Sequence, residues 1–338
     1  MKAALGRYQA AGQQHLGYAT RKGFVLISDT QAHADAMAKA SATLDGNTTY
    51  KSDVRTLRGS QIALAWTDLG ATSKLVLKRL AAVGGSSMQA APELKTTGRL
   101  AMGIHADSGY LELSGTTFGA SAGHSVAPVR SILALPANTA GAFEVSDPGG
   151  TAARNWSRSS SASHQALERQ LDGFGVSLPE DFAALLGTDL TVSAGPMAGA
   201  GPTPFAVQVT TPGGARAQSV IGQFFSDFNR YARQAGGSPL PLALQLTAKG
   251  YTVSNDPGYA KSLQPSAGAT LGSTPLFKAA VPHADGALAV GFFNVGSLLN
   301  SPGVPEQDRR TLAHIGAIGM SFNQAGGAAT FDLRVTVK

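Results

Sequence analysis

Residues Gly250–Asp256 read Gly-Tyr-Thr-Val-Ser-Asn-Asp, and residues Gly23–Asp29 read Gly-Phe-Val-Leu-Ile-Ser-Asp. Both stretches begin with glycine and an aromatic residue and end with aspartate, and the first contains the run Phe24–Ile27, which is typical of a strand. The similarity continues downstream without a gap, because Tyr50 matches Phe277 and the Ala-Thr-Leu triplet at 42–44 recurs at 269–271. Every match has the same separation of 227 residues. This fixed spacing predicts that the chain carries one structural unit twice.

The match extends further when one residue is dropped from the alignment. Ile62–Leu64 then falls on Leu288–Val290, and Trp66 falls on Phe292. A hairpin-like pattern follows in each copy, at residues 100–113 and 318–333, with glycine near both turns. The sequence therefore predicts a shared order of elements as well as shared residues.

The two copies differ in what precedes them. A long stretch, from about Ser131 to Asp227, comes before the second copy, whereas only 22 residues precede Gly23. We expect residues 1–128 to be the C-terminal half of a first unit and residues 129–338 to be a complete second unit. A full first unit would begin about a hundred residues earlier, so we expect either a late start or the loss of half a domain.

Short strand-like runs bounded by Gly, Pro, Asp or Asn alternate with amphipathic stretches along the chain. The clearest helix is predicted over Ala215–Gln234, where apolar residues recur every three or four positions. Several strands form close pairs, which favours antiparallel hairpins. The predicted fold class is α+β: two tandem related units of mainly antiparallel sheet, with helices packed on one face and the first unit incomplete.

Composition excludes several classes of site. The 338 residues contain no cysteine, so disulfides, zinc–thiolate sites and thiol nucleophiles are excluded. The formal net charge is +6, but the basic residues are scattered, so we expect no nucleic-acid partner. No run approaches the roughly 20 apolar residues that span a bilayer, and the opening 20 residues lack the apolar stretch of a signal peptide.

A second set of motifs resembles a known family. Leu135-Pro136-Ala137-Asn138-Thr139 and then Leu178-Pro179-Glu180-Asp181 with Leu185-Leu186-Gly187 are similar to blocks of the bacterial family catalogued as domain of unknown function 3352, as are Gly23–Asp29 and Ile62–Gly70. The resemblance implies an extracytoplasmic protein held by an N-terminal membrane anchor, and this chain lacks both the anchor and the first Leu-Pro block. The family supplies no catalytic residue to carry over.

One motif suggests chemistry. Gly119–Gly123 fits the G-x-S-x-G pattern around Ser121, which in hydrolases requires a helix directly after the serine. His124 and the residues after it carry no helix signal. A dispersed hydrolase site would combine Ser121 with His124, or with His105 and Asp107, and replacing Ser121 by Ala without loss of esterase or peptidase activity would remove that hypothesis.

His-Ala-Asp occurs three times, beginning at His33, His105 and His283. These histidines do not occupy matching repeat positions, so we expect surface or capping roles. We predict no catalytic, cofactor-binding or metal-binding residues and no cofactor. The favoured function is a non-enzymatic envelope-type protein that binds a partner protein, a lipid or an envelope polymer. A hydrolase and a truncated remnant without an independent role are the alternatives.

Overall fold

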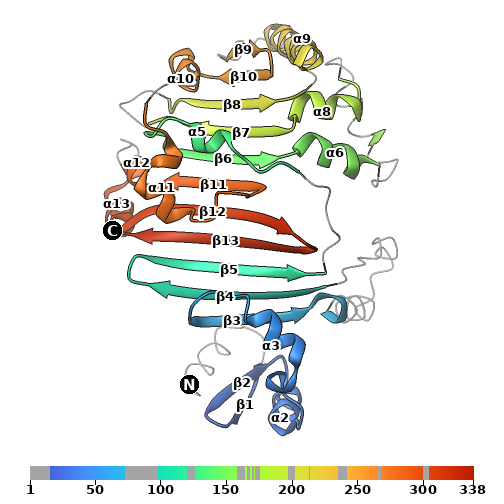
Figure 1. Ribbon diagram of the computed structural model, residues 1–338, viewed down its shortest axis with the longest axis vertical. Coiled ribbons are helices and arrows are strands. Elements are labelled where there is room, and N and C mark those ends of the chain that lie inside the picture. Colours follow the sequence, from blue (N-terminus) through green and yellow to red (C-terminus); the bar gives the residue numbers. More distant parts are fainter. Residues whose placement is uncertain are drawn as a thin grey trace. The chain divides into compact units, whose positions relative to one another are not determined.

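The computed structural model describes residues 16–72, 98–119, 126–157, 164–165, 168–169, 171, 176–196, 202–212, 214–234, 242–264, 268–299 and 304–338. The chain divides into two compact units, with the boundary after Arg55 (Figure 1). Each unit is described by itself.

The first unit is a hairpin followed by short helices. Tyr18 and Ile27 are partners in the antiparallel pairing of its two strands, and the turn between the strands uses the positive φ angles of Lys22 and Gly23. The side chain of Thr30 accepts a hydrogen bond from His33 N and starts the first helix. The elements are β1 (Gly17–Arg21), β2 (Phe24–Ser28), α2 (Gln31–Lys39), the 3₁₀ turn η1 (Leu44–Gly46) and α3 (Thr48–Val54).

The second unit is built on one antiparallel sheet of eleven strands. Its order is β3-β4-β5-β13-β12-β11-β6-β7-β8-β10-β9 (Figure 1). The strands are β3 (Gln61–Asp68), β4 (Arg99–Asp107), β5 (Tyr110–Phe118), β6 (Gly141–Ser146), β7 (Asp189–Ala194), β8 (Phe205–Thr210), β9 (Ala243–Thr247), β10 (Gly250–Ser254), β11 (Ala289–Asn294), β12 (Ile315–Ala325) and β13 (Ala328–Val337).

The helices that the structure describes in this unit are mostly short. They are α5 (Ser131–Ala134), α6 (Pro148–Trp156), α8 (Glu180–Leu186), α9 (Gly214–Gln234), α10 (Pro257–Ser262), the 3₁₀ turn η4 (Leu271–Ser273), α11 (Pro275–Ala280), α12 (Val295–Leu299) and α13 (Glu306–Leu312). The longest, α9, covers the stretch in which the sequence predicts the clearest helix. In the described part of the chain, no helix is both long and apolar enough to cross a membrane.

The middle of the sheet joins two similar arrangements. Strands β5 and β13 pair over nine residue pairs. On one side of this pair the order continues β4-β3, and on the other side it continues β12-β11. Strand β11 then pairs with β6, whereas β3 forms one edge of the sheet.

Two hydrophobic clusters lie on opposite faces of the sheet. On the face that we call inner, Ile132 and Leu135 of the α5 region pack with Phe277, Val290 and Phe292. On the outer face, α8 and α9 pack near the β9 edge, where Ala184, Ala217 and Ile221 contact Val209, Tyr251 and Val253. Helices therefore lie on both faces, whereas the sequence predicts them on one.

The α+β class and the antiparallel pairing are as the sequence predicts. The sequence did not identify β1, β6 or β10 as strands, nor the short helices α3, α6, α10 and α11. Val76, Leu80 and Val83 share one side of a helix that the sequence predicts over residues 71–83, and most of this stretch lies outside the described residues. The expected boundary between residues 128 and 129 falls within the second unit and stays a prediction.

Corresponding elements do occupy the spacing found in the sequence. The 3₁₀ turns Leu44–Gly46 and Leu271–Ser273 lie 227 residues apart, and the helix that follows each begins at Thr48 or Pro275. Asn47 and Thr274 cap these helices, each accepting from the backbone N–H three residues later. Asp68 and Asn294 also play one role, since each side chain accepts from the backbone three residues on.

Candidate functional site

The outer face carries an apolar row that crosses the whole sheet. Strand registers place Leu333 opposite Leu113 on one side and opposite Met320 on the other. Following these partners strand by strand gives a row without a polar side chain on any of the eleven strands. Its members are Ala63, Ile104, Leu113, Leu333, Met320, Gly291, Phe143, Val192, Val207, Val253 and Leu244.

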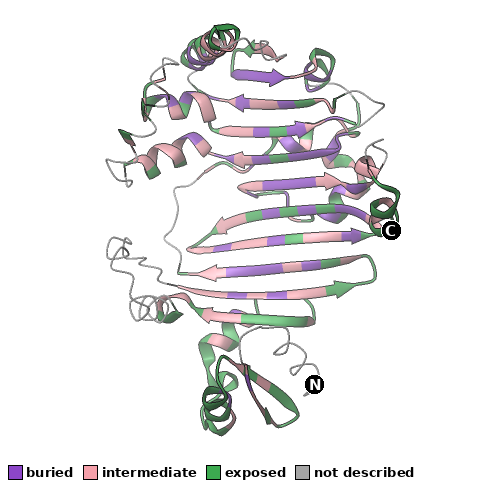
Figure 2. Cartoon of the chain, turned by 180° about the vertical axis from the view of Figure 1, so that it is seen from behind, coloured by how far each residue is buried: buried purple, intermediate pink, exposed green. Residues whose placement is uncertain are grey.

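Much of this apolar surface is open to solvent in the described structure. Leu333 and Met320 are each 40% exposed, and Phe143 and Val192 are similarly exposed. Adjacent outer-face positions add Leu111, Ile318 and Phe322. Figure 2 views the sheet from the side opposite to Figure 1, and no described helix lies in front of β5, β13 and β12 there. A contiguous exposed apolar patch of this kind marks an interaction surface more often than a free one.

The inner face carries a neighbouring row whose side chains are mostly polar. Ser114, Asp332 and Ser321 are direct partners across β5, β13 and β12, and all three are buried. The row continues through Val290 to Glu144, Thr191, Gln208, Thr252 and Gln245. Antiparallel sheets usually cover their apolar face and leave the polar face to water. Over β5, β13 and β12 this sheet has the reverse pattern.

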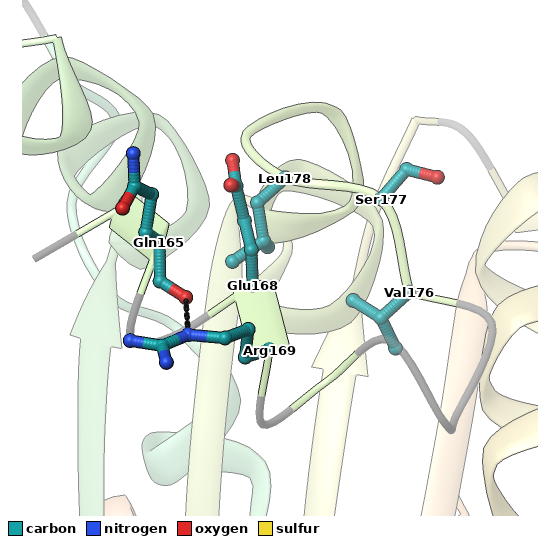
Figure 3. A pocket seen from close by; sticks show the side chains of 6 residues that line it. All are labelled: Gln165, Glu168, Arg169, Val176, Ser177 and Leu178. Carbon is teal, nitrogen blue, oxygen red and sulfur yellow. Dashed lines mark hydrogen bonds between the residues drawn. The ribbon is translucent and has the colours of Figure 1, made fainter. Parts of the chain in front are cut away.

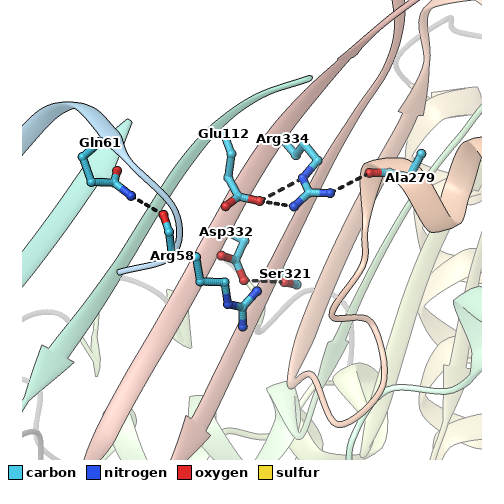
Figure 4. A network of polar contacts seen from close by, with 7 residues as sticks. All are labelled: Arg58, Gln61, Glu112, Ala279, Ser321, Asp332 and Arg334. Atoms are coloured by element: carbon cyan, nitrogen blue, oxygen red, sulfur yellow. Dashed lines mark hydrogen bonds and ion pairs between the residues drawn. The ribbon is translucent and has the colours of Figure 1, made fainter. Parts of the chain in front are cut away.

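Charged residues gather on the inner face where β5 meets β13 (Figure 4). Arg334 Nε donates to Glu112 Oε2 at 2.8 Å, and its Nη2 forms an ion pair with the same oxygen. The guanidinium carbon of Arg334 also lies 3.8 Å from the centre of the Tyr110 ring. Figure 4 shows Asp332 beside this pair, with Arg58 pointing toward it from the turn before β3.

The environment of Asp332 shifts its protonation. Burial and the negative charge of Glu112 raise the pKa of Asp332, while the charges of Arg58, His283 and Arg334 oppose that rise. Ser321 Oγ donates to Asp332 Oδ2 at 3.5 Å, which is a long hydrogen bond. Burial lowers the pKa of the nearby His283, and Arg58 adds to that effect.

This charged cluster is best explained as a structural contact that stabilises the pairing of β5 with β13. The Glu112 carboxylate is almost fully buried and receives two hydrogen bonds from Arg334, so its charge is compensated. The hydroxyl of Ser114 is buried and has no hydrogen-bond partner among the described residues, and Ser114 lies opposite Asp332. Among the described residues, no group of three or more His, Asp or Glu side chains is placed to hold a metal ion.

Glu144 is a buried carboxylate with a separate, structural task. It accepts hydrogen bonds from the backbone N–H groups of Arg130 (3.2 Å), Ser131 (3.0 Å) and Ile132 (2.5 Å), at the start of α5. Burial raises its pKa, and these three hydrogen bonds oppose the rise. Glu144 therefore fixes α5 to β6.

A cavity of about 630 Å³ lies away from both rows, beside the segment that leads to α8 (Figure 3). Arg169 Nε donates to the Gln165 carbonyl at 3.0 Å on its wall, and the charged side chains of Glu168 and Arg169 are exposed. A second cavity of about 600 Å³ lies within the first unit, between the hairpin and α2. Neither contains a buried charged side chain among its described lining residues.

The residues considered for a dispersed hydrolase site are not brought together in the part of the chain that the structure describes. Ser121 and His124 lie outside the described residues. His105 Nδ1 is 2.8 Å from the Ser60 carbonyl, which occupies the ring nitrogen that a catalytic carboxylate would need. Asp107 accepts from Ser108 N at 2.7 Å.

The other two His-Ala-Asp histidines lie in unlike places. His33 Nδ1 is 2.6 Å from Asp29 Oδ1 on the exposed surface of the first unit. His283 lies near the Asp332 cluster, which motif reasoning did not predict. The repeat predicts a hairpin in each copy but not that the two hairpins pair, so the sequence carries no signal for this cluster.

Comparison with protein families, with curated proteins and with solved structures gives no match for this chain.

Proposed function

We propose that this chain is a non-enzymatic interaction module of the cell-envelope type, which binds a protein partner through the outer face of its sheet. The single observation that supports this most is the uninterrupted apolar row, which is exposed at Leu333, Met320 and Phe143. Leaving such side chains in water costs free energy, at roughly 25 cal/mol per Å² of apolar surface. Covering them with a partner recovers that free energy.

A protein partner fits this surface better than a small ligand. Sheets bury an apolar face against a second layer of sheet or helices, and small-molecule sites are concave. The cavities described above are lined by residues of other surfaces, including Glu168 and Arg169 in one and Phe24 and Met37 in the other.

The setting follows from the resemblance to the domain of unknown function 3352. The Leu135–Thr139 and Leu178–Asp181 blocks support an extracytoplasmic, membrane-anchored protein. We also infer that the chain consists of two tandem related units, of which the first is incomplete. The equal spacing of the 3₁₀ turns and the matched caps at Asn47 and Thr274 support this inference.

The test compares native complexes in extracts of cells that produce the protein. The variant carries Leu111→Lys and Leu333→Lys, two outward-facing positions on neighbouring strands. We expect the wild-type protein to migrate well above its own mass of 34.4 kDa, and the variant to migrate as a folded monomer. Gln307→Lys on exposed α13 is the control and should leave the complex intact. A wild-type monomer, or a complex that survives both lysines, would contradict the proposal.

A further inference from the structure

Strand β3 is an edge of the sheet as far as the structure describes the chain. It runs over eight residues, Gln61–Asp68, and contains no proline, lysine or arginine. Its register shifts only at its start, between Gln61 and Ala63, so the part from Ala63 to Asp68 pairs regularly with β4. No described strand pairs with its outer edge, because β3 ends the sheet order. Native edge strands are normally short, charged, bulged or covered, since an open edge pairs readily with another chain. An edge of this kind is therefore a candidate for strand addition.

The corresponding strand of the second hairpin set, β11, has its edge covered. The sequence match places Leu64 on Val290 and Trp66 on Phe292, and each pair lies on the inner face. On β11 these positions are 0% and 5% exposed. On β3, Leu64 is 41% exposed, whereas Trp66 is only partly exposed. The position of Leu64 is thus open on β3, although its counterpart Val290 is buried on β11.

Residues 129–146 are the segment that covers β11. The segment is tied to β11 and the residues just before it by three backbone hydrogen bonds: Val129 N to Ala287 O (2.8 Å), Ser146 N to Leu288 O (2.8 Å) and Asn294 N to Ala140 O (2.7 Å). Between them, β6 pairs antiparallel with β11.

The helical part of the segment covers the inner face beside this edge. Ile132 and Leu135 of α5 and the residue after it pack in the same cluster as Val290 and Phe292. Residues 129–146 therefore supply both the strand that pairs with β11 and the apolar helical turn that covers the inner face beside it.

We propose that the outer edge of β3 binds a partner polypeptide segment with the arrangement of residues 129–146. One helical turn with apolar side chains covers Leu64, and the strand that follows it pairs antiparallel with β3. The site is distinct from the outer face, because Leu64 lies on the inner side of the sheet. It does not depend on the function proposed above.

The probe is a synthetic peptide with the sequence of residues 129–146, added to the full-length chain. The chain has two tryptophans, so Trp156→Phe leaves Trp66 on β3 as the single reporter. We expect a saturable blue shift of Trp66 emission as the peptide excludes water from the edge. A peptide carrying Phe143→Pro and Glu144→Pro lacks two successive N–H donors, and we expect it to bind at least about tenfold more weakly.

Matched protein variants locate the site. Leu64→Lys on β3 should weaken binding of the wild-type peptide by about tenfold or more, because the lysine charge would then be buried beneath the apolar helical turn of the peptide. Leu246 on β9, the other edge strand, is 50% exposed, and Leu246→Lys should leave the affinity unchanged. Circular dichroism of each variant confirms that the chain remains folded.

Three results would overturn the proposal. The first is absence of any Trp66 response at millimolar peptide, and the second is equal binding of the two peptides. The third is a dimer of the chain alone that Leu64→Lys dissociates, because a second copy would then occupy the edge. The Leu111→Lys, Leu333→Lys variant tests only the outer face, through loss of the complex in cell extracts. The peptide titration tests only β3, so either proposal can fail while the other stands.

Discussion

Glu112 of β5 and Arg334 of β13 lie directly opposite each other and form an ion pair, although 222 residues separate them in the chain. This pair sits on the inner face, where the two similar strand sets meet. It links the hairpin that follows β3 to the hairpin that follows β11.

Removing one member of this pair should be costly. Arg334→Ala leaves the Glu112 carboxylate buried without its partner, and we expect a loss of about 3–5 kcal/mol of unfolding free energy. Urea unfolding followed by circular dichroism measures it. The double change of Glu112→Gln with Arg334→Met removes both charges and should cost clearly less. A loss under about 1 kcal/mol for Arg334→Ala would show that the pair does not stabilise the pairing of β5 with β13.

The pH dependence of stability should reveal Asp332. Burial and the charge of Glu112 raise its pKa above the ordinary 3.8, against Arg58, His283 and Arg334. The unfolded chain therefore loses this proton at lower pH than the folded chain, and stability falls as pH rises from about 3.8 through the folded-state pKa.

Asp332→Asn should remove that contribution. We expect the variant to gain stability relative to wild type as pH rises through this window, with a constant difference above it. Urea unfolding at a series of pH values gives the difference curve, in which effects of other groups such as Glu144 cancel. A variant that loses stability relative to the wild-type protein as pH rises through this window would contradict the assignment.

The two faces of the sheet predict different costs for one kind of substitution. Phe292 of β11 is buried on the inner face, whereas Phe322 of β12 is exposed on the outer face. Phe292→Ala should cost about 3–5 kcal/mol, and Phe322→Ala should cost less than about 1 kcal/mol in the purified protein. Equal costs in chemical unfolding would mean that the outer face is already covered.

The helix caps test the proposed relation between the two tandem units. Asn47 and Thr274 accept the same i+3 hydrogen bond, so Asn47→Ala and Thr274→Ala should each cost about 1 kcal/mol. Hydrogen exchange of α3 and α11 resolves the loss in each place. A cost at Thr274 with none at Asn47 would argue that the two caps are not equivalent.

Local patterns predicted a good part of this fold. The alternating apolar residues in Ile318–Phe322 and the apolar residues spaced every three or four positions in Ala215–Gln234 are local patterns. The strand and the helix that they predict both form where expected. Strand β6 was missed because Glu144 interrupts its apolar run, and that residue is used to cap α5. Helix α6 was missed because Asp147-Pro148-Gly149-Gly150 has the composition of a turn.

The candidate surfaces could not be predicted in the same way. Alternating apolar and polar residues show that β13 has two different faces, with Leu333 on one and Asp332 on the other. The alternation does not show which of these faces other elements will cover. The Glu112–Arg334 pair depends on a contact between distant strands, for which neither residue carries a local signal. For the place of β3 at the edge of the described sheet, the only signal in the sequence was the unequal length of the two predicted copies.

The most direct test of the outer-face proposal is a photo-cross-linking residue at position 333 in cells that produce the protein, with one at exposed position 307 as the control. We predict a discrete protein adduct at position 333 that is absent at position 307 and disappears with Leu111→Lys. Lipid adducts only, or no adduct specific to position 333, would contradict the proposed protein-binding role.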